Sequence, residues 1–277
     1  MFALQDLDPL TNLPRKPPLP LFSESWRSWF RYRQISDPSH YEPPVGHATT
    51  IVNWPQNDYF HGDIIRCDAV TRAQRLQESR DLSLSFLHWL RTECPRDEGG
   101  RGYPELGLEP EAMGTRDGLA KAPYIRESRR IVSMRRVVEQ DVAADAFPSL
   151  SCSPEIVPSV GIGSYRIDLH PSTSRRLYVD LATLPFNIPL GALVPFRIRN
   201  MIPACKNIGT THITNGCYRL HPVEWNIGES AGILAAFCLR EGVEPRKVLA
   251  DTALSSSYQE LLLSQGIELS WPDGLFA

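Results

Sequence analysis

The sequence lacks several features that would place it in a broad class of protein. It has no run approaching the ~18 apolar residues that a membrane-spanning helix needs, and its first residues, MFALQDLDPLTNLPRKPP, show no signal-peptide pattern. We therefore expect a cytoplasmic protein. The six cysteines form no CxxC pair and no metal-ligand spacing, which predicts reduced thiols and no metal site. A net charge of −3 favours neither nucleic acid nor a membrane as a partner.

What the sequence does have is enough length for a sizeable core, together with many prolines. The chain has 277 residues, 42% of them hydrophobic, which suits one large domain or two small ones. Its 24 prolines are about 9% of the residues, against ~5% in typical proteins. They concentrate in residues 9–55 and 147–203, so these segments are expected to be rich in loops.

The stretch from Pro203 to Gly242 is dense in polar residues and leads into a helix. Pro222 suits the first turn of a helix, Glu224 complements the positive end of the helix dipole, and Gly242 suits a left-handed stop. The apolar residues that recur at helical spacing between these signals are Val223, Ile227, Ala231, Leu234 and Cys238. The sequence therefore predicts an amphipathic helix over residues 222–241.

A second face of this helix carries only the small residues Gly228, Gly232 and Ala236. A glycine inside a helix costs about 1 kcal/mol relative to alanine, so two of them indicate that something approaches the backbone closely. That neighbour is either a flat ligand or another element of the chain, and the pattern leaves both open. The free N–H groups at the start of the helix suit a phosphate, a carboxylate or an electron-rich ring edge.

The rest of the chain is expected to supply a scaffold of helices and strands. Asp63 is expected to cap a long helix that ends at Glu93. Two short helices are expected after Pro245. The segments with strand-like patterns are residues 122–140, Tyr165–His170, Leu177–Leu181 and Ala192–Ile198.

Arginines lie on both faces of the strand expected at residues 122–140. Arg126 or Arg129 either holds an anionic substrate or forms an internal salt bridge with Glu127 or Asp117. Both alternatives satisfy the requirement that an arginine in a protein interior finds a carboxylate partner.

Two further groups of residues also have two interpretations each. Asp168 and His170 share one face of an expected strand, and they form either an acid–base pair or a structural contact. In the segment Ser25–Arg33, Trp26 and Trp29 either pack as part of a strand or stack on a ligand.

The run from Asn207 to Gly232 resembles the C-terminal flavin-binding segment of the bacterial family of FAD-dependent oxidoreductases with a GxGxxG-type fold. Three upstream segments are similar to the same family in the same order, and they are Ile51–Tyr59, Gly114–Gly118 and Pro123–Ile131. The resemblance covers most of residues 45–265. It implies an FAD cofactor and the transfer of a hydride from a small organic substrate to the flavin.

The same resemblance implies a mixed α/β (α+β) fold. The chain would form the C-terminal part of a Rossmann-like FAD-binding fold with a substrate domain made of an antiparallel sheet and helices. The implied domains are a loop-rich arm at residues 1–62, a substrate-side domain at 63–190 with the long helix and antiparallel strands, and the C-terminal part of the FAD-binding domain at 191–277.

The resemblance implies three groups of site residues, each assigned by its position in the matching motifs. The catalytic candidates are His212 and His221 as bases and Arg219 as the group that stabilises negative charge on the flavin. The substrate-binding candidates are Asn53, Asn57, Arg126 and Arg129, with neutralisation of a reduced flavin as the alternative role of Arg126 or Arg129. The cofactor-binding candidates are Asn207, Ile208, Gly209, Gly228, Glu229, Ser230, Ala231 and Gly232.

The sequence lacks the GxGxxG fingerprint with which such flavoproteins hold the ADP half of the cofactor. The nearest candidate, Gly161-Ile162-Gly163, is followed by an alternating pattern typical of a strand, so a turn or bulge is expected there. The chain is therefore expected to be the C-terminal portion of a family member. The alternatives are an inactive truncated remnant or a subunit that requires a partner with the missing N-terminal half. A carbohydrate-binding or structural domain using the rings of Trp26, Trp29 and Tyr32 is a third interpretation.

Overall fold

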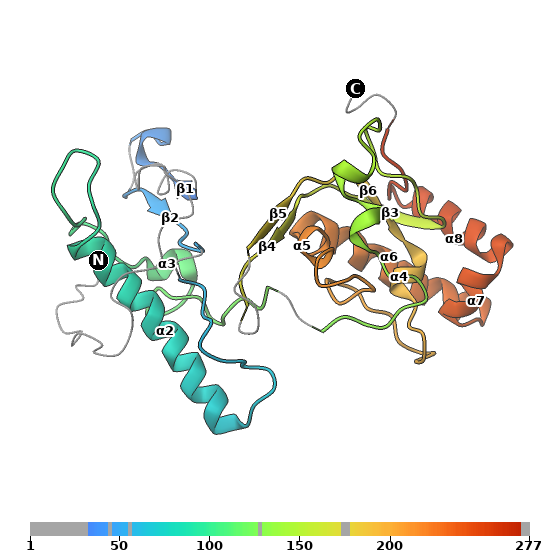
Figure 1. Cartoon of the computed structure of the whole chain (residues 1–277), viewed down its shortest axis with the longest axis horizontal. Helices are drawn as coiled ribbons and strands as arrows, with labels where there is room; N and C mark the ends of the chain where they lie inside the picture. Colours follow the sequence, from blue (N-terminus) through green and yellow to red (C-terminus); the bar gives the residue numbers. More distant parts are fainter. Residues whose placement is uncertain (1–32, 44–45, 55–56, 127–128, 173–177, 273–277) are drawn as a thin grey trace. The chain divides into compact units, whose positions relative to one another are not determined.

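The computed structural model describes residues 33–272, except 44–45, 55–56, 127–128 and 173–177. The aromatic segment Ser25–Arg33, apart from its last residue, lies outside the described residues. The chain forms two compact units, which are considered separately (Figure 1). The first comprises Met1–Tyr124 with Ser172–Arg175, and the second comprises Ile125–Pro171 with Arg176–Ala277. The functional domains expected at 1–62, 63–190 and 191–277 stay a prediction.

The first unit is built on one long helix, α2 (Ala69–Thr92). The helix begins five residues later than expected, because Asp68 and not Asp63 is its cap: the Asp68 side chain accepts a bond from the Thr71 N–H at 2.9 Å. Asp63 instead closes a preceding turn with the Ile65 N–H. The other elements of this unit are β1 (Gln34–Ser36), η1 (Pro38–His40), β2 (Thr49–Thr50) and α3 (Pro110–Met113).

One side of α2 packs on a small aromatic core. The buried side chains of this core are Trp54, Phe86, Trp89, Leu90, Cys94 and Tyr103. The Cys94 N–H donates to the carbonyl of Trp89 at the end of the helix, which confirms that the helix ends here. This unit is therefore a scaffold held together by aromatic packing.

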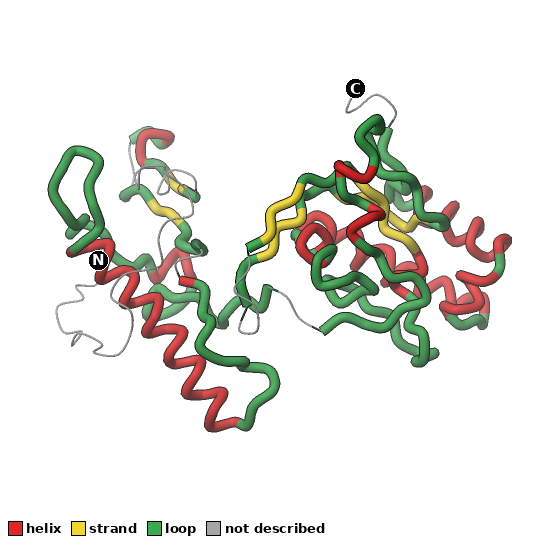
Figure 2. The backbone as a smooth tube through the Cα atoms, viewed as in Figure 1, coloured by secondary structure: helices red, strands yellow, loops and turns green. Residues whose placement is uncertain are grey.

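The second unit contains the larger core, in which antiparallel strand pairs are covered by helices (Figure 2). Strand β3 (Ser159–Gly163) pairs with β6 (Phe186–Pro189), and β4 (Ile167–Leu169) pairs with β5 (Val179–Leu181). The helices are α4 (Leu190–Leu193), α5 (Asn215–Tyr218), α6 (His221–Glu241), α7 (Pro245–Ala250) and α8 (Thr252–Ser264), and the short 3-10 helices are η3 (Glu139–Asp141) and η4 (Ala144–Ala146). All of the named strand pairs in the described part of the chain are antiparallel, and the mixed α and β class is confirmed.

Helix α6 forms as its sequence predicts. The five residues of the expected apolar stripe are all buried. Gly242 follows the helix with φ of 64°, the left-handed conformation that glycine adopts without strain. The two short helices after Pro245 are also confirmed as α7 and α8, and Gly266 ends the second with a positive φ.

Two expected strands are wrong and one expected irregularity is confirmed. The described residues between 122 and 138 form isolated bridges at Ser133 and Val137 and no named strand, because their backbone bonds go to several different loops, and residues 139–140 begin η3. The segment Ala192–Ile198 begins inside the buried helical turn α4. Gly161-Ile162-Gly163 lies in β3, where the register against β6 shifts between Ser159 and Ile162, as expected for a bulge.

Candidate functional site

The candidate site lies where the chain passes from α5 into α6. Arg219 follows α5, and its side chain is buried to 6% exposure. Its Nη2 donates to the carbonyl oxygen of Asp168 on β4 at 2.8 Å and lies 3.4 Å from the Asp168 carboxylate oxygen Oδ2. Gly216 permits this approach, since a Cβ there would lie 3.1 Å from both the backbone N and O of Asp168. The local sequence of α5 therefore sets Arg219 against β4.

Asp168 also contacts a histidine and a tyrosine from its own hairpin. His170 Nε2 lies 3.6 Å from Asp168 Oδ2, and the edge of the His170 ring faces Tyr178 with ring centres 5.8 Å apart. Both His170 and Asp168 are largely buried. The two side chains lie close together, as both interpretations of the sequence pattern require, whether the pair acts as acid and base or makes a structural contact.

The charges of this cluster decide the ionisation of Asp168. Burial opposes the charged carboxylate and is the largest single influence, but the hydrogen bond and charge of His170 and the charges of two arginines together outweigh it and hold the pKa of Asp168 below its ordinary value. The charges of Arg219 and Arg126 act in the same direction. Burial, followed by the charge of Asp168, raises the pKa of Tyr178 to about 12. The cluster thus holds an anionic carboxylate next to a neutral phenol.

The four substrate-binding candidates are divided between the units. Arg126 lies in the second unit, near enough to Asp168 to act on its ionisation, and Arg129 is exposed in that same unit. Asn53 and Asn57 lie in the first unit, where the Asn57 side chain donates to the carbonyl of Val52.

Glu127 and Asp117 are the carboxylates expected to pair with Arg126 or Arg129, and Asp117 pairs with another arginine. Asp117 forms its ion pair with Arg80 on α2. Glu127 lies outside the described residues.

The three catalytic candidates differ in burial. Arg219 is buried, whereas His212 and His221 are exposed. His221 is the first residue of α6, so its backbone lies at the positive end of the helix dipole. The catalytic roles of all three stay predictions.

Glu224 lies in the first turn of α6, as its sequence position indicates, and its side chain has a partner in the preceding loop. Its Oε2 accepts a bond from the thiol of Cys205 at 3.0 Å. Burial, and then this bond to Glu224, raise the pKa of the Cys205 thiol. Glu224 therefore ties the preceding loop to the first turn of α6.

The loop residues among the cofactor candidates are largely engaged within the chain. The Gly209 N–H donates to the carbonyl of Ala192 at 2.9 Å, and the carbonyl of Asn207 accepts from the Ile131 N–H. Ile208 is buried. The part of these three residues in a flavin site stays a prediction.

The α6 residues among the cofactor candidates fall on two faces. Ser230 and Ala231 are buried, and the Ser230 hydroxyl donates to the carbonyl of Val160 on β3. Glu229 and Gly232 are exposed. A Cβ at Gly232 would meet no atom within 4 Å, and one at Gly228 would meet only the Ala204 carbonyl oxygen, at 3.4 Å. Tight packing within the described part of the chain therefore does not account for Gly232.

Comparison with known proteins decides the family. The sequence model of the family described as FAD dependent oxidoreductase matches residues 15–261. The chain belongs to the FAD-dependent oxidoreductase family. FAD is the cofactor that this family implies. No curated protein and no solved structure matches the chain.

The residues of this FAD-dependent oxidoreductase fit one end of FAD better than the other. A flat ring has room to approach the α6 backbone at Gly232, where a Cβ would meet no atom within 4 Å. The ADP half needs a GxGxxG turn in a unit of parallel strands. The sequence has no such fingerprint, and the named strand pairs of the described segments are all antiparallel. The described residues therefore suit the flavin end of the cofactor.

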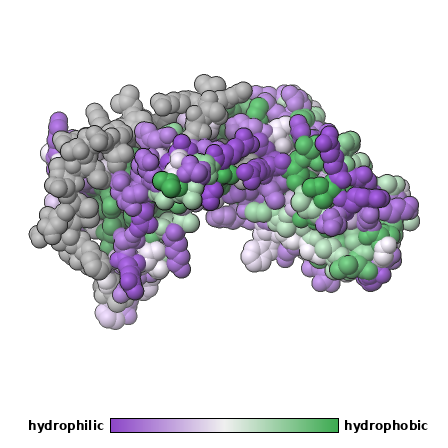
Figure 3. Space-filling view, turned by 90° about the horizontal axis from the view of Figure 1, so that it is seen from below, coloured by the Kyte–Doolittle hydropathy of each residue, from purple (hydrophilic) through white to green (hydrophobic). Residues whose placement is uncertain are grey.

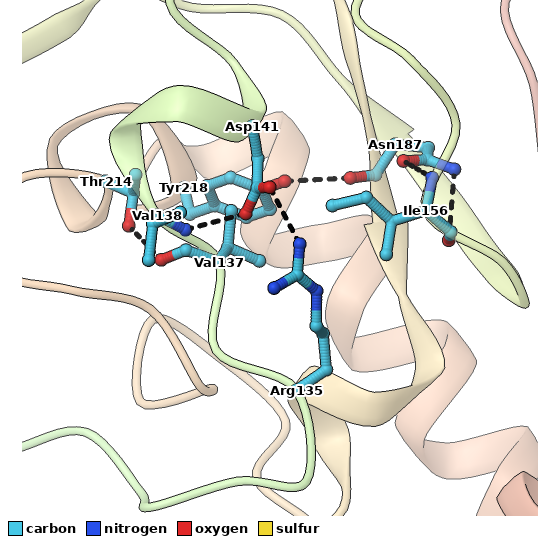
Figure 4. Close-up of polar contacts among 8 residues, drawn as sticks. All are labelled: Arg135, Val137, Val138, Asp141, Ile156, Asn187, Thr214 and Tyr218. Atoms are coloured by element: carbon cyan, nitrogen blue, oxygen red, sulfur yellow. Dashed lines mark hydrogen bonds and ion pairs between the residues drawn. The ribbon is translucent and has the colours of Figure 1, made fainter.

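Polar contacts of Thr214 and Tyr218 hold helix α5 of this oxidoreductase in place (Figure 4). The Tyr218 hydroxyl donates to the carbonyl of Asn187 on β6 at 2.8 Å, and the Thr214 hydroxyl donates to the carbonyl of Val137 at 2.9 Å. These bonds fix both ends of α5, and so the position of Arg219. Sequence reasoning missed Thr214 and Tyr218, because no local pattern shows that their hydroxyls find carbonyls 77 and 31 residues away.

Three further observations concern metals, thiols and membranes. Among the residues that the structure describes, no group of three or more histidines, cysteines or acids is placed to hold a metal ion. All six cysteines are free thiols, as expected. None of the described helices is long and apolar enough to cross a membrane.

Proposed function

We propose that this family member transfers a hydride from a small organic substrate to FAD. It would form the C-terminal, Rossmann-like part of the flavin-binding fold. The observation that carries the proposal is a buried, oriented Arg219 just before α6, together with a face of the same helix that is open at Gly232, about three turns further along. When bound, the flavin supplies the electron-accepting chemistry. The chain supplies orientation, charge and a proton acceptor.

Arg219 and the start of α6 supply positive charge at one place. The guanidinium is held by Asp168, and the free N–H groups of the helix lie two residues further along the chain. The guanidinium and the helix N–H groups are already oriented before a ligand binds, so both can stabilise negative charge on it. This stabilisation is strongest where water is excluded. Arg126 adds a second positive charge near Asp168 and suits an anionic group on the substrate.

The proton acceptor is a histidine at the mouth of the site. His212 and His221 are exposed and so remain accessible to a substrate. The imidazole would take the proton of the O–H or N–H next to the C–H bond that loses the hydride.

A second candidate function is a subunit that binds FAD only with a partner. The exposed face of α6 favours it, since Trp225 and Leu239 are 72% and 85% exposed and Gly232 between them has open space. An apolar helix face of this kind is typical of a surface that another chain covers. Residues outside this sequence would then hold the ADP half of FAD, and without them the chain would be an inactive remnant.

The deciding experiment is a titration of the purified full chain with FAD, followed by visible absorption. We expect flavin bands with a resolved shoulder and saturable binding. Arg219→Gln should weaken binding at least tenfold, because a charge-assisted bond contributes about 1.5–3 kcal/mol. Arg219→Lys keeps the charge and should retain part of the affinity. Arg240→Gln is the matched control, since Arg240 lies at the far end of α6 and pairs with the adjacent Glu241.

The possible results separate the two candidates. Binding that depends on Arg219 supports a cofactor site in this chain, and anaerobic bleaching by alcohols, amines and hydroxy acids then identifies the substrate. No binding at any FAD concentration refutes a stand-alone enzyme and supports the partner-requiring subunit. Equal loss in Arg219→Gln and Arg240→Gln refutes the place assigned to the flavin.

A further inference from the structure

Two extended segments of the second unit run antiparallel at its surface. The Met134 N–H donates to the carbonyl of Val194, and the Phe196 N–H donates to the carbonyl of Val132, both at 2.8 Å. In this bonding pattern Val132 and Phe196 lie opposite each other, so their side chains project to the same side. Val132 is 62% exposed and Phe196 is 54% exposed.

Two more large apolar residues extend this exposed pair. Met134 lies two residues after Val132, and Ile198 lies two residues after Phe196, and both are exposed. We call these four residues the Val132–Phe196 patch. Figure 3 shows one face of the molecule, on which apolar surface of the second unit adjoins strongly polar surface.

Arginines within three residues of the patch add positive charge. Arg129, Arg136 and Arg197 are all exposed. In the described part of the chain none of the three forms an ion pair with an acidic side chain.

Other arginines nearby are compensated, which makes these three distinct. Arg135 pairs with Asp141 at 2.7 Å, and Arg199 pairs with Glu244 at 2.9 Å. The surface around the patch therefore has an excess of positive charge, although the chain as a whole has a net charge of −3. Exposed charges more than about 8 Å apart are largely screened from each other at physiological salt, so the local excess of positive charge determines what binds here.

We propose that the Val132–Phe196 patch docks on a membrane leaflet that contains anionic phospholipid. The four apolar side chains would enter the boundary between headgroups and acyl chains, and the three arginines would contact phosphate groups. Large apolar side chains surrounded by cationic ones suit binding to such an interface, and neither the apolar nor the cationic groups alone suffice. The protein would then act on substrates or electron carriers at a membrane surface without spanning it.

The test is co-sedimentation of the full chain with vesicles, and it needs no FAD, so its result is independent of the proposed function. Vesicles of phosphatidylcholine alone are compared with vesicles of phosphatidylcholine mixed with phosphatidylglycerol. We expect binding to the mixed vesicles only, weakening as salt is raised. Arg197→Gln should weaken binding about fivefold, which corresponds to ~1 kcal/mol per arginine near an anionic surface. Phe196→Ser should also weaken binding to the mixed vesicles, because it removes a large apolar side chain from the patch.

The matched controls are Arg166→Gln and Leu263→Ser. Arg166 is an exposed arginine that is paired with Asp180, and Leu263 is an exposed leucine on α8, away from the patch in sequence. Both variants should bind like the wild type. Failure of the wild type to bind anionic vesicles overturns the proposal and leaves a protein partner as the occupant of the patch. Equal losses in the control and patch variants overturn it as well.

Discussion

Asp168→Asn should destabilise the second unit because it leaves the buried Arg219 without its anionic partner. Removing one partner of a fully buried ion pair costs about 3–5 kcal/mol. The cost is lower here, because the carbonyl of residue 168 still accepts from Arg219 at 2.8 Å and the carboxylate is 18% exposed. We therefore expect a loss of about 2 kcal/mol in the free energy of unfolding at pH 7.

The pH dependence of this loss has a definite sign. The pKa of Asp168 is depressed in the folded state, so its contribution is complete above the ordinary carboxyl pKa of about 4. The contribution disappears as pH falls through the lower folded pKa. The difference in stability between wild type and Asp168→Asn should therefore shrink as pH is lowered below the ordinary carboxyl pKa and through the depressed pKa of folded Asp168.

The assay is urea unfolding at several pH values, with Asp180→Asn as the control. Asp180 faces Asp168 directly across the β4–β5 pair, but its partner Arg166 is exposed. Exposed ion pairs contribute about 0–1 kcal/mol, so the control should change little. Equal effects of the two substitutions, or a difference for Asp168→Asn that stays constant into acid, would refute the reasoning.

Three other predictions concern packing and thiol reactivity. Gly209→Ala should lower the melting temperature, because the added Cβ overlaps the Ser133 hydroxyl and lies 2.9 Å from the Arg135 carbonyl, and such overpacking costs about 1–3 kcal/mol. Tyr258→Phe should cost about 1 kcal/mol in urea unfolding, because it removes a buried hydrogen bond of 2.7 Å to the Ser230 carbonyl, and an unchanged midpoint would contradict this. In native labelling with a thiol reagent near pH 8, the raised pKa of Cys205 should make it slow to react, and Glu224→Gln should speed it.

The structure of α6 followed from local information. Its stripe, the proline in its first turn and its terminal glycine all act within the helix itself, so sequence alone sufficed. The start of α2 was less determined, because Asp63 and Asp68 are both suitable caps. The side chain that reaches the N–H of the third helical residue, Thr71, is that of Asp68.

The contacts of Arg219 needed tertiary information. Asp168 is 51 residues away in the sequence, and only the placement of α5 against β4 joins them. For the same reason the strand expected at residues 122–140 failed: alternation predicts a strand, but a strand needs one continuous partner, and this segment bonds to several loops. Of the predicted site, the helix and the identity of Arg219 were accessible from the sequence, while its partner was not.

The arrangement at Arg219 also limits how the site could work. Because Nη2 is held by a backbone carbonyl, the guanidinium keeps that anchor whatever side chain stands at position 168. Removing the carboxylate would therefore change the charge next to the start of α6 more than the position of Arg219. If Arg219 stabilises negative charge on a ligand, Asp168→Asn should raise the affinity for an anionic ligand and Arg219→Gln should lower it. If the pair is purely structural, both substitutions should lower that affinity.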